Sequence, residues 1–132
     1  MTDWRGTELS IDETQWPIVT VRWSGAPSDQ EVQRILRQMD QWLARRERFG
    51  LLLDSRGASG LSPEQRNEVV GYMKQHASLT APFLVQAIVI DNLIQRTLFY
   101  GINLIFPNQF ESKVFSDPAS ARRWLGAVLG KD

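Results

Sequence analysis

The sequence predicts an α/β domain, with a mixed five-stranded sheet flanked by about four helices in the order ββαβαβαβα. The first observation is a set of three apolar runs, interpreted as strands, at residues 51–53, 84–90 and 113–115. The second is that stretches with helical periodicity separate these runs, which requires right-handed crossovers between the strands. The third is a pair of strand-like stretches near the N-terminus, which makes the first strand antiparallel. We expect a single domain over residues 1–132, with residues 1–6 as a flexible lead-in.

The first two strands are predicted to form a hairpin at one side of the sheet. Leu9 and Ile11 alternate with polar residues, which is the pattern of a half-exposed strand. Residues 13–15 form the expected turn. Residues 17–23 are rich in β-branched side chains, and Pro17 takes the first strand position, where proline is tolerated.

The first helix is predicted from its N-terminal cap. Ser28 and Glu31 form a capping-box signature, and apolar residues at helical spacing follow for about five turns. Arg45, Arg46 and Arg48 gather at its C-terminal end, where the helix dipole favours cations. A nucleic-acid patch is the weaker interpretation, because acidic residues balance the chain and no aromatic residues interleave with these arginines.

A strand, a polar loop and a helix start follow one another in the middle of the chain. The run 51–53 is typical of a strand buried on both faces, although periodicity alone also allows a buried helix. Asp54 ends this run, and residues 55–60 have the composition of a loop. Ser62 is the expected cap of a helix that Pro63 starts and that runs to about residue 76.

The third helix is the most unusual element that the sequence predicts. A linker over residues 78–82 leads to the most β-prone run of the chain, which ends in Asp91 and Asn92. Asn92 caps the helix 93–106, which is apolar nearly all round and is therefore either deeply buried or shared with a partner. We expect a partner surface on it, formed by two aromatic residues beside its narrow polar sector: Phe99, Phe106, Arg96 and Asn103. A short strand over residues 110–115 and a closing helix capped by Asp117 complete the fold.

Composition excludes several classes of function. Fifteen basic and fifteen acidic residues leave no net charge, so bulk electrostatics give no argument for nucleic acid or an anionic membrane surface. The chain has no cysteine, which excludes thiolate catalysis and cysteine metal sites, and its single histidine, His76, is expected at the surface. No metal or cofactor is expected. With neither a signal-peptide pattern nor a membrane-spanning run, the chain is predicted to be soluble and cytoplasmic.

Three pieces of sequence together resemble a known family: the LLLD strand end at Leu51–Asp54, the long apolar helix after Asp91, and the closing KVFSDPASARRWL from Lys113. With the spacing of the elements, they resemble the STAS superfamily, and more closely the bacterial SpoIIAA-like proteins, also called STAS/SEC14-like, from about Ile11 to Leu129. The resemblance implies a regulatory or adaptor domain that docks on partners. In the antagonist branch of the superfamily, a serine in an Asp-Ser-Ser-Gly-type loop is phosphorylated, and SEC14-like relatives hold a lipid.

The resemblance places two candidate phosphoacceptors in this chain. The Asp-Ser-Ser-Gly pattern itself does not occur, but Ser62 stands closest to that position, and Ser59 lies in the loop before it. Two hydrolase-like interpretations of the same loop fail, because Gly57-Ala58-Ser59-Gly60 is followed by Leu61 and lacks both the final glycine of a nucleophile elbow and the lysine of a Walker loop.

A second candidate site is the end of the predicted parallel strands, where ligands of open α/β sheets bind. We expect the residues that follow two of these strands to bind a ligand or a partner there: Asp54, Ser55, Arg56, Gly57, Asp91 and Asn92. The alternative is that these side chains only cap helices and order turns.

Two hypotheses of function follow. The first is a non-enzymatic regulatory or scaffold domain, switchable by phosphorylation, that binds another protein or a second copy of itself. The alternative is a sensor of a small ligand bearing a phosphate or a carboxylate, or of a lipid. A hydrolytic enzyme is disfavoured because a lone histidine has no nucleophile or orienting acid to work with.

Overall fold

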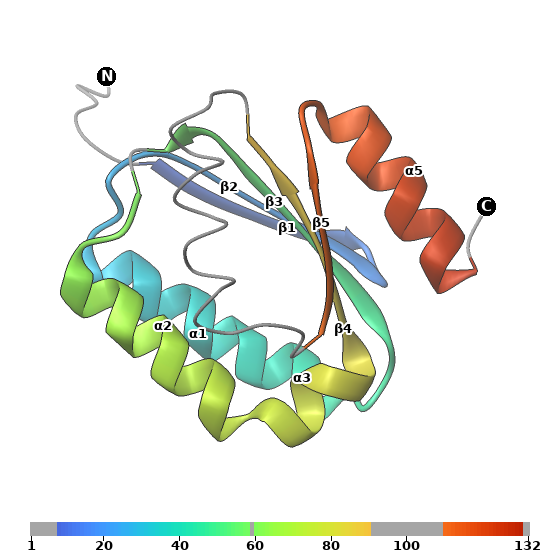
Figure 1. The fold of residues 1–132 in the computed structure, drawn as a ribbon, viewed down its shortest axis with the longest axis horizontal. Helices are drawn as coiled ribbons and strands as arrows, with labels where there is room; N and C mark the ends of the chain where they lie inside the picture. Colours follow the sequence, from blue (N-terminus) through green and yellow to red (C-terminus); the bar gives the residue numbers. More distant parts are fainter. Residues whose placement is uncertain (1–7, 59, 91–109, 131–132) are drawn as a thin grey trace.

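The protein folds as a mixed five-stranded sheet with helices on both faces, as the sequence predicts (Figure 1). The computed structural model describes residues 8–58, 60–90 and 110–130. Strand order follows chain order; β1 is antiparallel to β2, and all other neighbours are parallel. The strands are β1 (Glu8–Gln15), β2 (Ile18–Gly25), β3 (Phe49–Ala58), β4 (Leu84–Val89) and β5 (Glu111–Phe115). The described helices are α1 (Asp29–Ala44), α2 (Pro63–Gln75), α3 (Ala77–Phe83) and α5 (Pro118–Leu129).

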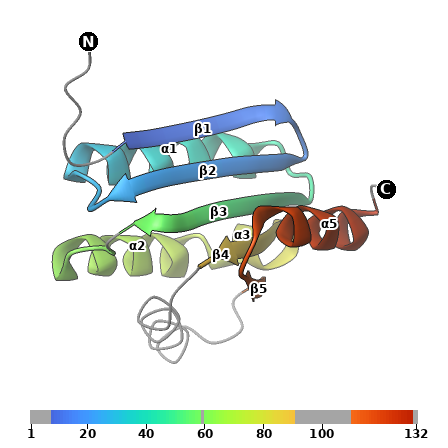
Figure 2. The same ribbon diagram turned by 90° about the horizontal axis from the view of Figure 1, so that it is seen from above.

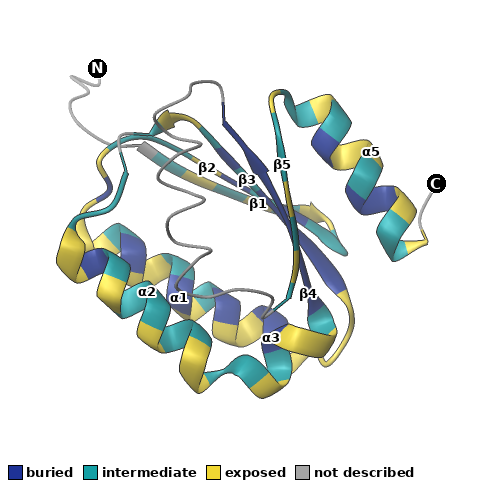
Figure 3. Ribbon diagram, viewed as in Figure 1, coloured by how far each residue is buried: buried dark blue, intermediate teal, exposed yellow. Residues whose placement is uncertain are grey.

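Two apolar cores hold the helices to the sheet. Helices α1, α2 and α3 lie on one face and α5 on the other (Figure 1). In the first core, Met39 and Trp42 of α1 pack among buried residues of β2 and β3. In the second, Leu125 of α5 packs against Leu52 and Val85. The buried residues run along the strands and the inner sides of α1 and α5 (Figure 3).

A glycine in β3 leaves room for two leucine side chains of α5, Leu125 and Leu129. A Cβ atom built on Gly50 would lie 2.9 Å from a methyl carbon of Leu125, which is closer than real Cβ atoms approach other carbons. Any larger residue at position 50 would therefore force the buried side chain of Leu125 to shift.

Local side-chain chemistry starts three of the helices, as predicted. Ser28 caps α1 and Ser62 caps α2, and each forms a complete capping box, with Glu31 and Gln65 respectively. Asp117 caps α5, where its carboxylate accepts the backbone N–H of Ser120 and holds the pKa of Asp117 below its usual value. These caps satisfy backbone donors that have no partner inside a helix.

Two predicted connections prove wrong. Residues 78–82, the predicted linker, lie in helix α3, because the burial of Thr80 and the packing of Leu79 and Phe83 on the first core favour a helix despite Pro82. Residues 13–15, the predicted turn, belong to β1, and the reversal falls at Trp16 and Pro17. Trp16 stacks on the buried Phe49, and this contact holds the reversal against the sheet.

Two of the three arginines predicted at the C-terminal end of α1 contact other elements, and none of the three lies in the last turn of the helix, which ends at Ala44. Arg45 lies over the ring of Trp16. Arg48 donates to the carbonyl oxygen of Val128 and to Glu111, which ties the start of β3 to α5 and β5. No helix in the described ranges is both long enough and apolar enough to cross a membrane.

Candidate functional site

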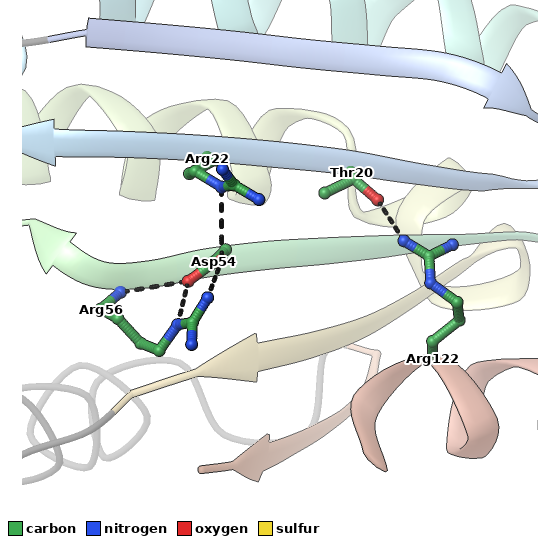
Figure 4. A network of polar contacts seen from close by, with 5 residues as sticks. All are labelled: Thr20, Arg22, Asp54, Arg56 and Arg122. Carbon is green, nitrogen blue, oxygen red and sulfur yellow. Dashed lines mark hydrogen bonds and ion pairs between the residues drawn. The ribbon is translucent and has the colours of Figure 1, made fainter. Parts of the chain in front are cut away.

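A polar, arginine-bearing surface lies on the sheet beside α5. The helix packs mainly on β3 and β4, and β1 and β2 extend past it (Figure 2). The side chains on this face are therefore polar and reach solvent. We call this surface the arginine face and define it by five residues, shown in Figure 4: Thr20, Arg22, Asp54, Arg56 and Arg122.

Asp54 is the buried centre of the arginine face. It is 3% exposed, and Arg56 binds it with two parallel hydrogen bonds, from Nε to Oδ1 at 2.9 Å and from Nη2 to Oδ2 at 2.8 Å (Figure 4). Arg22, opposite Asp54 in the sheet register, places its Nε 3.4 Å from Oδ2. One buried carboxylate thus orients two guanidinium groups.

Hydrogen bonding outweighs burial in deciding the charge of Asp54. The hydrogen bonds from the side chain and backbone of Arg56, with the charges of both arginines, lower the pKa of Asp54, whereas burial acts in the opposite direction. Asp54 is therefore an anion at neutral pH. Its partners are far more accessible, because the Arg22 side chain is 66% exposed and that of Arg56 is 40% exposed.

A third guanidinium lies two residues along β2. Arg122 of α5 donates from Nη2 to the hydroxyl of Thr20 at 3.1 Å. Asp12, opposite Thr20 in the register, bonds to Thr14, and this contact lowers the pKa of Asp12. The five residues that define the arginine face carry three positive charges against one negative charge, and two acidic residues of β1, Glu8 and Asp12, border it in the register.

The loop predicted over residues 55–60 begins later than expected, which corrects the sequence-based interpretation. Strand β3 continues through Ser55, Arg56 and Gly57 to Ala58, because its end pairs with Ser24 and Gly25 of β2. Two residues of β3 oppose Trp23 alone, which is a bulge in the ladder. Gly57 fits closely there, since an added Cβ atom would lie 3.2 Å from that of Ser24 and would push it back by a few tenths of an ångström.

Ser62, the first candidate phosphoacceptor, is at the N-terminus of α2, as predicted. Its hydroxyl accepts the backbone N–H of Gln65 at 3.1 Å. The Gln65 side chain is buried and donates to the carbonyl oxygen of Pro27 and to Asp29, both at 2.9 Å. The N-termini of α1 and α2 are thereby linked through one glutamine.

The remaining predicted site residues lie outside the described residues, namely Ser59, Asp91, Asn92, Arg96, Phe99, Asn103 and Phe106. Conversely, Arg22, Thr20 and Arg122 were not among the predicted site residues. The alternation of Thr20 and Arg22 with valines in β2 was the available signal for a polar face. Only the register shows that Arg22 faces Asp54.

An open groove of about 570 Å³ runs between α1 and α2. The hydroxyl of Tyr72 donates to Asp40 across the groove at 2.6 Å, and burial, followed by this contact, raises the pKa of Tyr72. His76 stacks on Tyr72, donates from Nδ1 to the Tyr72 carbonyl oxygen at 2.9 Å, and places Nε2 3.7 Å from Asp40. Within the described ranges, no cluster of His, Cys, Asp or Glu side chains could hold a metal ion.

Solved structures share this fold. An uncharacterised protein of the DUF3478 family from Shewanella loihica PV-4, with a SpoIIAA-like fold, is 20% identical with a TM-score of 0.68, over 95% of this chain and 98% of its own. An anti-sigma factor antagonist from Mycobacterium paratuberculosis is 10% identical with a TM-score of 0.56, over 91% of this chain and 94% of its own. At these identities the likeness is one of fold.

The sheet order and the helices on both faces thus define an α/β domain of the SpoIIAA-like fold. The SpoIIAA-like family model matches residues 18–126. The chain belongs to the SpoIIAA-like family, which confirms the resemblance seen in the sequence. No curated protein matches the chain by sequence.

Proposed function

We propose that this chain is a non-enzymatic regulatory domain that acts by binding another protein, and that the arginine face is part of its binding surface. The observation that carries the proposal is the geometry at Asp54, where a buried carboxylate holds the Arg56 guanidinium through two hydrogen bonds and contacts the more exposed Arg22 at 3.4 Å. Preorganised arginines are well suited to a partner, because less side-chain entropy is lost on binding. Structural similarity to an anti-sigma factor antagonist supports a regulatory role.

The proposal is tested by crosslinking in the native host, with a tagged chain and identification of captured proteins by mass spectrometry. Arg22→Glu reverses one charge of the arginine face. Arg34→Glu is the matched control, because Arg34 is an exposed residue of α1, on the opposite side of the sheet. We expect a partner that the wild type and the control retain and that Arg22→Glu loses. The same captured set in all three, or none in any, would refute the proposal.

We extend the proposal to a phosphorylation switch at Ser62. A phosphate on this hydroxyl would enter the hydrogen-bond network in which Gln65 contacts the carboxylate of Asp29. Attraction to the N-terminus of α2 favours the phosphate, whereas repulsion from Asp29 weakens the link between the helices. Phosphoproteomics of the native protein tests this, with Ser62→Ala and Ser59→Ala as separate variants. Modification that persists in Ser62→Ala and disappears in Ser59→Ala would move the switch to Ser59.

The groove between α1 and α2 favours ligand sensing as the second candidate function, because it is wide enough for a small polar molecule. A thermal-shift screen with nucleotides and acyl compounds tests it, and Tyr72→Phe should abolish any shift. A screen without shifts would eliminate this candidate. Self-association through residues 93–106 and a cytoplasmic location stay predictions, which light scattering and cell fractionation test.

A further inference from the structure

The arginine face has unused hydrogen-bonding capacity as well as charge. Arg22 contacts Asp54 only through Nε, so its two terminal nitrogens have no partner among the described residues. Arg122 donates only from Nη2, to Thr20, and its other nitrogens form no hydrogen bond with the described residues, although its charge also helps to lower the pKa of Asp12 opposite Thr20. By contrast, Arg56 already uses two nitrogens on Asp54. Arg22 and Arg122 are therefore the two groups available to a binding partner.

The two available guanidiniums are spaced by the geometry of one strand. Arg122 lies at Thr20, and Arg22 is two residues farther along β2 on the same face. Two residues of a strand span about 6.6 Å. Carboxylates at alternate positions of an extended peptide have the same spacing, so one peptide would place one carboxylate at each arginine.

We propose that the arginine face binds an extended acidic segment of the partner protein, with carboxylates at alternate positions facing Arg22 and Arg122. This inference rests on the proposed function and names the chemistry of the partner. Charge complementarity supports it, since the five residues of the arginine face carry three positive charges and one negative charge, although the whole chain is neutral. Carboxylates also match the planar fork of arginine, which binds them through two hydrogen bonds.

The test uses fluorescence anisotropy with labelled synthetic peptides of twelve residues. The first peptide has glutamate at alternate positions, the second replaces each glutamate with glutamine, and the third carries the same glutamates in one block. We expect the alternating glutamate peptide to bind about tenfold more tightly than the glutamine peptide. It should bind about threefold more tightly than the block peptide, and its affinity should fall as salt is added.

Variants locate the binding on the arginine face. Arg22→Ala and Arg122→Ala should each weaken binding of the alternating peptide about three- to fivefold, whereas Arg34→Ala should not change it. Both arginines are exposed, and an unchanged circular dichroism spectrum with a single cooperative thermal transition will show that the variants keep the fold. Equal affinity for the glutamate and glutamine peptides, equal affinity for the alternating and block peptides, or an equal loss in Arg34→Ala would overturn the inference.

The outcome also separates this inference from the function on which it rests. A native partner that Arg22→Glu loses, combined with no preference for the glutamate peptide, would leave the proposed function intact and overturn only the acidic segment. A clear glutamate preference that requires Arg22, without any native partner, would support the binding chemistry and refute the proposed function.

Discussion

Removing either member of the Asp54–Arg56 pair should destabilise the protein, but by unequal amounts. In Arg56→Met the carboxylate keeps the 3.4 Å contact with Arg22 and the 3.4 Å hydrogen bond from the backbone N–H of residue 56, but it loses both hydrogen bonds from the guanidinium. Breaking a buried pair in this way costs about 3 kcal/mol or more. In Asp54→Asn the two arginines lose their carboxylate partner, but water can solvate them, because the Arg56 side chain is 40% exposed and that of Arg22 is 66% exposed. That change should cost only about 1–2 kcal/mol, the value of the lost charged hydrogen bonds.

The pH dependence of these variants provides an independent check of the same reasoning. The pKa of Asp54 is lowered from 3.8 in the folded protein, so its pairing contributes stability above that value. The contribution is lost as the pH falls through the lower folded-state pKa. The cost of Asp54→Asn should therefore shrink in acid. The cost of Arg56→Met should shrink as well, because the carboxylate left without Arg56 becomes protonated and neutral.

Urea denaturation at pH 7 and at about pH 3, followed by circular dichroism and fluorescence, measures both effects. Arg22→Met is the matched comparison, since it removes a single longer contact and should cost about 0.5–1 kcal/mol. A cost of Asp54→Asn that equals or exceeds that of Arg56→Met would refute the reasoning. Costs that do not change with pH would show that the charge of Asp54 has no role in stability.

Three further predictions concern the helices. Gly71→Ala should stabilise the protein by about 0.5–1 kcal/mol in urea denaturation, because the added methyl group meets no atom within 4 Å and lowers the flexibility of the unfolded chain. Gly50→Ala should instead destabilise the protein by about 1–3 kcal/mol, because its added methyl group meets Leu125. A loss of stability in Gly71→Ala would contradict this account. Tyr72→Phe should lower the free energy of unfolding by about 1 kcal/mol. A double-mutant cycle with Asp40→Asn should assign most of that loss to the hydrogen bond between the two side chains. If the losses of the two single variants simply add up in the double variant, the hydrogen bond contributes nothing. Ser62→Ala should lower the free energy of unfolding by about 1 kcal/mol, seen as a lower melting temperature. Ser62→Asp keeps a hydrogen-bond acceptor at the cap and should therefore lower the melting temperature less. Equal losses in the two variants would mean that the capping hydrogen bond does not stabilise the protein.

Local patterns were sufficient to predict most elements of this fold. The capping boxes at Ser28 and Ser62 and the cap at Asp117 act within three residues, so their helix starts could be read directly. The apolar runs of β3 and β4 were recognisable because strands covered on both faces must be apolar along their whole length. The candidate site was predicted only in part, since Asp54 and Arg56 were found as neighbours in sequence.

Tertiary structure decided the features that depend on which distant residues meet. Helix α3 forms because Leu79 and Phe83 find a core to pack on, and β3 runs past Asp54 because the end of β2 is there to pair with it. The position of Arg22 beside Asp54 is a matter of register, and a shift of one residue would turn Arg22 to the opposite face. The sequence by itself therefore determined the elements and their caps. Which charges share a face was decided by the register between strands. Backbone hydrogen bonds between strands form whatever the side chains are, so only the packing of side chains selects that register.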